Sequence, residues 1–325
     1  MKKIFRVLGF TVAGVLFVVA CAAAFVSVRG IPFYEAPKPQ VANIDYTPVR
    51  VAQGQKIVNA MCADCHLSRE TNALTGKFLP EIPEDFGKLY SANITQDKAH
   101  GIGAWTDAEL VGLLRTGIGR DGRYRIVMPS FAHMSDEDVY SVIAYLRSND
   151  AQVQPNPTPS HEQEPSFLAK ALANTVMKPL PLPTQPVLAP SPTDAAAYGR
   201  YLVVGRYMCY DCHSKDFKTN NALEPEKSEG YLGGGNSFMT PDKKEIKSRN
   251  LTPDAETGIG DWTENQFVQA VRFGLSPHGP LNAPMPKFSL MDASEAKAIY
   301  AYLQTVPAIK HDIPLFGATA SVATR

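Results

Sequence analysis

The sequence predicts a mainly α-helical protein in which two similar units follow an apolar N-terminus. Three observations predict this arrangement. Motifs recur at a constant spacing of 157 positions, helix-capping signals recur with them, and no alternating strand pattern recurs in both copies. The 325 residues allow about a hundred for each unit. The formal net charge of zero leaves no basic surplus for binding nucleic acid.

The internal repeat extends through most of each unit. It maps Asn93-Ile94-Thr95 onto Asn250-Leu251-Thr252 and, in the same register, pairs Gly101/Gly258, Trp105/Trp262, Arg115/Arg272, Met128/Met285, Met134/Met291 and Tyr145/Tyr302. We therefore predict a first unit at 50–150 and a second at 193–312, with a tail at 313–325.

The N-terminal segment, residues 1–30, predicts a membrane anchor. Lys2, Lys3 and Arg6 precede an uncharged stretch at 7–28, and its 22 residues span roughly 33 Å as a helix, enough for a bilayer. The basic side stays in the cytoplasm, so both units are expected in the periplasm, outside a bacterial inner membrane. Cys21 follows a lipobox-like Val-Val-Ala, which leaves a lipid anchor at Cys21, or ordinary cleavage, as alternatives to an uncut helix.

Each unit contains one Cys-x-x-Cys-His pentad, at Cys62-Ala63-Asp64-Cys65-His66 and at Cys209-Tyr210-Asp211-Cys212-His213. Two thiols three positions apart on one helical turn can add to the two vinyl groups of haem, while the adjacent histidine reaches the iron. A redox dithiol or half a zinc site is the alternative for a single copy, and two copies with the same histidine count against it. The pentads use four of the five cysteines, so none in the soluble part remains for a disulfide.

Capping signals predict where the helices of each unit begin and end. Helices are expected at 51–61 and 195–208, running into the pentads. Thr106 and Thr263 are expected to cap helices that end at Gly117 and Gly274, and Ser135 with Asp138, like Asp292 with Glu295, predicts a capping box before the last helix of each unit.

The linker at 151–192 contains ten prolines, which favour extended structure over helix. It is either a spacer between the units or a segment that wraps over the surface of one of them.

Two pairs of methionines are candidates for a sixth iron ligand, because no histidine outside the pentads recurs in both copies. Met128 and Met285 each precede proline, which holds them extended on a loop. Met134 and Met291 precede capping residues and are expected to pack on the first turn of a helix. We therefore assign iron ligation to Met128 and Met285. A histidine and a methionine would fill all six positions of the iron, which suits electron transfer.

The order of these motifs resembles the class I cytochrome c domains of membrane-bound dehydrogenase cytochrome subunits, such as those of alcohol and gluconate dehydrogenases. The resemblance implies two tandem class I cytochrome c domains with two covalently bound haem c groups. It makes His66 and His213 proximal ligands and Met128 and Met285 distal ligands. Those subunits typically carry three haem domains, whereas this chain has two pentads.

The resemblance implies an electron carrier between a respiratory dehydrogenase or quinol-oxidising complex and a terminal acceptor. The alternative is a dihaem enzyme such as a cytochrome c peroxidase. A redox complex in the membrane is the expected setting, with other redox proteins or subunits as partners. As an electron-transfer protein the chain is not expected to be an enzyme itself, although it fits the cytochrome subunit of an oxidoreductase complex.

Weaker predictions concern haem propionates and one loop. Trp105 and Trp262 are candidate indole donors and Arg115 and Arg272 candidate ion-pair partners for propionates, the alternatives being core aromatics and solvated helix charges. The pentads are only 147 positions apart, so the second unit has about ten extra residues between His213 and Asn250. We expect that insertion, with Gly233–Gly235 and Lys243, Lys244, Lys247 and Arg249, to form a surface loop that docks a redox partner.

Overall fold

A computed structural model describes residues 2–41, 43–240 and 242–314 of the chain. Within these residues lie ten α-helices, short 3-10 and π-helical segments and three two-stranded antiparallel pairs, so the expected mainly α-helical architecture is confirmed. Most of the predicted tail, residues 315–325, lies outside the described residues.

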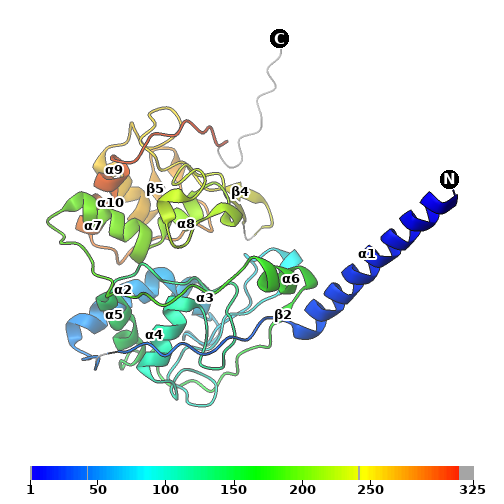
Figure 1. The fold of residues 1–325 in the computed structure, drawn as a ribbon. Coiled ribbons are helices and arrows are strands. Elements are labelled where there is room, and N and C mark those ends of the chain that lie inside the picture. The colour runs from blue at the N-terminus through cyan, green and yellow to red at the C-terminus, as the bar shows by residue number, and fades with distance from the viewer. Residues whose placement is uncertain (1, 42, 241, 315–325) are drawn as a thin grey trace, which may run out of the picture.

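Helix α1 (Lys2–Arg29) projects away from the rest of the chain (Figure 1). By length and composition it is able to cross a membrane, and its side chains lie on the surface. Helix α6 (Phe167–Thr175) meets its C-terminal end, where Asn174 Nδ2 donates to the carbonyl oxygen of Gly30 at 2.8 Å.

The first hydrophobic core forms where α2 (Pro48–Met61) crosses α5 (Asp136–Leu146), with α4 (Asp107–Thr116) beside them. Gly54 makes the close crossing feasible, because a Cβ atom there would lie 1.8 Å from the carbonyl oxygen of Ser141. We call residues 44–153, which supply this core, the first unit.

The second core repeats this crossing. Helix α7 (Ala195–Tyr201) packs on α10 (Ala293–Leu303), which also contacts α9 (Glu264–Phe273). A Cβ atom at Gly199 would lie 1.9 Å from the carbonyl oxygen of Ala298, which corresponds to Ser141 at the 157 offset. We call residues 195–314 the second unit, and the two units lie one above the other in Figure 1.

The predicted caps of α4 and α9 are confirmed. Thr106 and Thr263 each form a capping box, with Glu109 and Gln266, and both helices end at a glycine with positive φ.

The capping box predicted from Ser135 and Asp138 is only half formed. The Asp138 N–H donates to Ser135 Oγ at 3.2 Å, but the Ser135 N–H donates to the hydroxyl of Tyr201, and the Asp138 carboxylate binds Arg206. Asp292 and Glu295 do form the expected contact, because the Asp292 N–H donates to Glu295 Oε2 at 3.0 Å.

The helix expected at 195–208 is interrupted. After α7 the chain is π-helical at Leu202–Arg206, and Met208 has a left-handed φ of 48° just before α8 (Cys209–His213). Gly199 precedes Cys209 by ten positions, whereas Gly54 precedes Cys62 by eight. The π-helical turn therefore accommodates two residues that the first unit lacks.

The proline-rich segment wraps over the first unit. Strand β2 (Glu164–Pro165) pairs with β1 (Gly87–Lys88), and Asn93 Nδ2 donates to the carbonyl oxygens of Asn156 and Thr158 at 2.9 and 2.8 Å. The other strand pairs lie in the second unit and comprise β3 (Ser237–Met239) with β4 (Glu245–Lys247), and β5 (Leu275–Ser276) with β6 (Gly279–Pro280).

Candidate functional site

The first pentad begins at Cys62, just after α2, and continues into the short helix α3 (Ala63–His66), whereas the second occupies α8 (Cys209–His213), which follows the π-helical segment. Cys62 packs against the first core and Cys209 against the second, and both are partly buried. Each unit thus places its pentad at the edge of its own core.

Both pentad histidines have one ring nitrogen fixed by a backbone carbonyl. His66 Nδ1 lies 2.7 Å from the oxygen of Ala92, and His213 Nδ1 lies 2.8 Å from that of Arg249. Because a carbonyl only accepts, Nδ1 carries the proton and Nε2 keeps its lone pair. Burial lowers the pKa of both histidines, which favours the neutral ring. Each histidine is therefore prepared to bind a metal through Nε2.

Ala92 and Arg249 were not found by sequence reasoning, although they are repeat partners 157 positions apart. Each immediately precedes the repeated Asn-x-Thr motif. In that motif the asparagine Oδ1 accepts from the N–H and the hydroxyl of the threonine, in Asn93 with Thr95 and in Asn250 with Thr252. The motif folds the loop that presents the carbonyl, and this explains why it recurs.

A glycine N–H binds the backbone carbonyl oxygen of each pentad histidine. Gly76 donates its N–H to the carbonyl oxygen of His66 at 2.8 Å, and Gly234 donates to that of His213 at 2.7 Å. Both have positive φ, 82° and 69°, and a Cβ atom would meet the carbonyl oxygen of Ser91 at 2.2 Å or that of Ser248 at 2.5 Å. Only glycine fits both requirements without strain.

The extra residues lie between His213 and Asn250 as predicted, but the expectation that they include the glycine run is wrong. Gly76 follows His66 by 10 positions, whereas Gly234 follows His213 by 21, so the extra residues lie between His213 and Gly233. Gly234 of the glycine run belongs to the backbone contacts around the pentad histidine that both units share. Lys243, Lys244 and Lys247 do lie on the exposed β3–β4 hairpin, but Arg249 is half-buried and donates to the carbonyl oxygen of Pro314 at 3.1 Å.

The thiols are not activated. Burial raises the pKa of Cys62 and Cys209 to about 12, and burial together with Asp64 raises that of Cys65 to about 11. A reactive redox dithiol needs a lowered pKa. The environment of the pentads therefore disfavours the redox-dithiol alternative.

The two methionine pairs differ in burial. Met134 and Met291 lie inside the cores, at 1% and 3% exposure. Met128 and Met285 are only partly buried, and each packs against the same core as the pentad of its unit. Each lies in a turn of the same kind, in which the methionine N–H donates to the carbonyl oxygen three residues earlier. Each Met-Pro pair thus lies at the edge of its core.

Comparison with known proteins agrees with this geometry. Residues 49–146 match the family model described as cytochrome c oxidase, cbb3-type, subunit III. A diheme cytochrome c-type protein of Cereibacter sphaeroides is 28% identical over 268 residues, which cover 77% of this chain and 83% of that protein. The chain is therefore similar to proteins described as c-type cytochromes.

Dehydrogenase cytochrome subunits are also similar to it. The fructose dehydrogenase cytochrome subunit of Gluconobacter japonicus is 31% identical over 273 residues, covering 77% of this chain and 51% of that protein. The cytochrome c subunit of a quinone alcohol dehydrogenase of Gluconacetobacter polyoxogenes is 27% identical over 302 residues, covering 89% and 61%. The predicted resemblance is confirmed, and the chain spans little more than half the length of those subunits.

The residues present fit haem c, the cofactor that these relationships support. Each pentad offers two thiols and a histidine whose Nδ1 is bound to a backbone carbonyl, and a partly buried methionine packs against the same core. Two thiols and an adjacent imidazole are the groups that covalent attachment of haem c requires.

The arginines proposed for haem propionates differ from each other. Arg115 is 2% exposed, and its guanidinium donates to the carbonyl oxygen of Phe131 at 2.9 Å and pairs with Asp136. Its contacts are therefore structural, joining α4 to the start of α5. Arg272 instead has a buried Nε with no hydrogen-bond partner among the described residues. The two tryptophans, Trp105 and Trp262, pack partly buried against their cores.

Proposed function

We propose that the chain is a membrane-anchored dihaem cytochrome c that carries electrons from a respiratory dehydrogenase or quinol-oxidising complex to a terminal acceptor. In this proposal one haem c is attached to Cys62 and Cys65 and the other to Cys209 and Cys212. Haem supplies a one-electron couple, and the protein binds, shields and orients it.

One observation carries the proposal of two haems. The contact that fixes the tautomer of the pentad histidine occurs in both units, at His66 with Ala92 and at His213 with Arg249. The contact leaves Nε2 free to bind iron in each unit. Preparing the same ring nitrogen twice is expected of two metal sites and is not needed for a purely structural histidine.

Met128 and Met285 are proposed as distal ligands, opposite His66 and His213. A neutral thioether favours ferrous iron and raises the reduction potential. With all six positions filled, no position remains for peroxide, which favours a carrier over a peroxidase. Trp105, Trp262 and Arg272 are proposed as the residues that would contact haem propionates. The orphan Nε of Arg272 supports its part in this.

Helix α1 is proposed to anchor the chain in a bacterial inner membrane, with both units in the periplasm. Its length and apolar surface support the span, and the basic residues at its start support a cytoplasmic N-terminus. Lipidation of Cys21 would replace the helix by a lipid anchor but leave both units on the same side.

The donor is proposed to be a dehydrogenase subunit, because the relatives include cytochrome subunits of fructose, alcohol and gluconate dehydrogenases. The substrates in these names are those of the relatives' complexes. Isolation of the chain with its native partners, followed by mass spectrometry, identifies the donor and separates a permanent subunit from a free carrier.

The ligand assignment is tested by replacing Met128 or Met285 with alanine. We expect two haems per chain by pyridine haemochrome assay, both low-spin with a thioether-to-iron band in the near infrared. Each replacement should remove that band for one haem and lower its potential, because a neutral ligand that favours ferrous iron is lost. The same change at buried Met134 or Met291 should leave the band in place. A high-spin wild type that turns over peroxide would establish the peroxidase alternative instead.

A further inference from the structure

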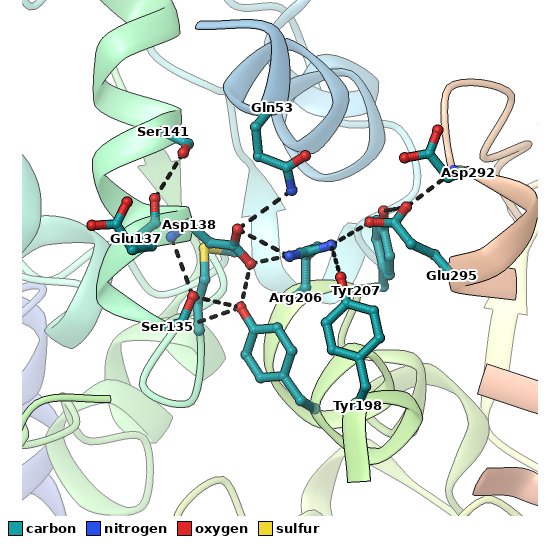
Figure 2. A network of polar contacts seen from close by, with 12 residues as sticks. Gln53, Ser135, Glu137, Asp138, Ser141, Tyr198, Arg206, Tyr207, Asp292 and Glu295 are labelled. Carbon is teal, nitrogen blue, oxygen red and sulfur yellow. Dashed lines mark hydrogen bonds and ion pairs between the residues drawn. The ribbon is translucent and has the colours of Figure 1, made fainter. Parts of the chain in front are cut away.

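The two units meet at a buried cluster of charged side chains, shown in Figure 2. Arg206 donates from Nε to Asp138 Oδ2 at 2.5 Å and from Nη2 to Asp138 Oδ1 at 3.1 Å, and its Nη1 binds Glu295. None of the three side chains is more than 6% exposed. One guanidinium therefore joins α5 of the first unit to α10 of the second.

Three tyrosines of the second unit surround this guanidinium. Its carbon lies 5.5–6.0 Å from the ring centroids of Tyr198, Tyr201 and Tyr207. Tyr207 donates to Glu295 Oε2 at 3.0 Å, Arg206 Nη1 donates to the Tyr198 hydroxyl at 3.1 Å, and the Tyr201 hydroxyl binds Asp138. These contacts offset the desolvation of the charges, which a bare buried ion pair does not achieve.

The carboxylates of the cluster are related by the repeat, but the arginine is not. Asp138 and Glu295 are 157 positions apart, each at the third position of the last helix of its unit. Arg206 is the last residue of the π-helical segment, which the uninterrupted α2 of the first unit lacks. The π-helical segment of the second unit thus places a cation between the two equivalent acids.

The cluster lies beside the segments that enter the pentads. Arg206 precedes Cys209 by three positions. Met61 and Met208, the residues immediately before the two pentads, each pack against both cores. The relative placement of the two pentads thus depends on the interface that Arg206 holds.

We propose that Arg206 is a positioning residue that fixes the relative orientation of the two units, and with it the path for direct electron exchange between their haems. The proposal rests on the dihaem function proposed above. In the exchange one iron passes from ferrous to ferric as the other passes from ferric to ferrous, and no atom is transferred. Another docking of the units that buried Asp138 away from Arg206 would leave this carboxylate without a cation, and that cost disfavours alternative geometries.

The test compares three forms of the full-length, haem-loaded chain. Arg206→Met removes the shared cation. The triple variant Arg206→Met, Asp138→Asn, Glu295→Gln also removes the buried charges, so it tests the geometry if the single variant fails to fold. Lys56→Met is the matched control, because Lys56 pairs with Asp292 across the same interface but is partly exposed.

Two readouts are independent of donor activity. Electron exchange between the haems is followed by pulse radiolysis, and magnetic coupling between the two ferric haems by electron paramagnetic resonance. We expect both Arg206 variants to keep two low-spin haems, to slow the exchange by about tenfold or more and to lose the wild-type coupling, because a shift on the order of 1 Å is enough to disturb a reacting geometry. Lys56→Met should match the wild type.

Wild-type exchange and coupling in the folded triple variant would overturn the proposal and leave Arg206 a stabilising residue only. Arg206→Lys adds a further check, because it keeps the charge but not the two-pronged contact with Asp138, and exchange should fall between wild type and Arg206→Met. A wild-type chain with one haem would overturn the dihaem function itself, and this is seen before any variant is made.

Discussion

In the first unit the helix before the pentad runs uninterrupted from Pro48 to Met61, whereas in the second it becomes π-helical at Leu202–Arg206. The second unit also has the longer connection between His213 and Gly233, in which the carbonyl oxygen of Ala222 lies 2.8 Å from His133 Nε2 of the first unit. Both additions touch the first unit, and neither alters the contacts of the pentad histidines. Two copies of one fold can therefore acquire an asymmetric interface while the backbone contacts of their pentad histidines stay the same.

The largest expected effect comes from removing one attachment site. Replacing Cys62 and Cys65 with serine, or Cys209 and Cys212, should lower the haem content from two per chain to one, because the units have separate hydrophobic cores. A pyridine haemochrome assay on purified chain measures this. Loss of both haems from either variant would show that the units do not mature independently.

An intermediate effect is expected at the two glycines that hold the pentad histidines. Gly76→Ala and Gly234→Ala should each lower the free energy of unfolding by about 1–3 kcal/mol, because the new Cβ atom overlaps backbone atoms in both units. Denaturant unfolding measures it. Gly279→Ala is the control, since Gly279 also has positive φ, 111°, but no atom within 4 Å of the new Cβ. A cost at Gly279 as large as at Gly76 would mean that backbone strain, not crowding, sets the effect.

The smallest effect is expected at the edge of the interface. His133→Leu removes the hydrogen bond to Ala222, and it should cost about 0.5–1.5 kcal/mol of unfolding free energy. Lys243→Ala, which breaks an exposed pair with Glu84 across the units, should leave the unfolding midpoint unchanged, because solvent screens such pairs. If the Lys243 change exceeded the His133 change, the β3–β4 hairpin would hold the units together more strongly than the inserted connection.

Local signals were sufficient for much of the fold. Thr106 and Thr263 cap their helices as predicted because the donor and acceptor lie within one turn of each other. Ser135 and Asp138 follow the same pattern in sequence, yet the Asp138 carboxylate turns to Arg206, 68 positions away. A partner that distant cannot be inferred from spacing within one helix, so the capping box was predicted and the interface was not.

Sequence comparison also failed to assign the glycine run correctly. Gly233–Gly235 has no counterpart of equal composition in the first unit, so sequence comparison assigned it to the insertion. Only the backbone contacts show that Gly234 does for His213 what Gly76 does for His66. One glycine at the right φ is enough for that contact, and composition does not reveal which one supplies it.

By itself the sequence determined the pentads, the repeat, the apolar first helix and the methionine–proline pairs, because these features depend on covalent chemistry or on neighbours within a few residues. Tertiary structure decided which carbonyl fixes each histidine, that Arg115 is already paired whereas the Nε of Arg272 has no hydrogen-bond partner in the described part of the chain, and that Arg206 joins the two units. Those contacts form between segments far apart in the chain, and their geometry exists only after the two cores have packed.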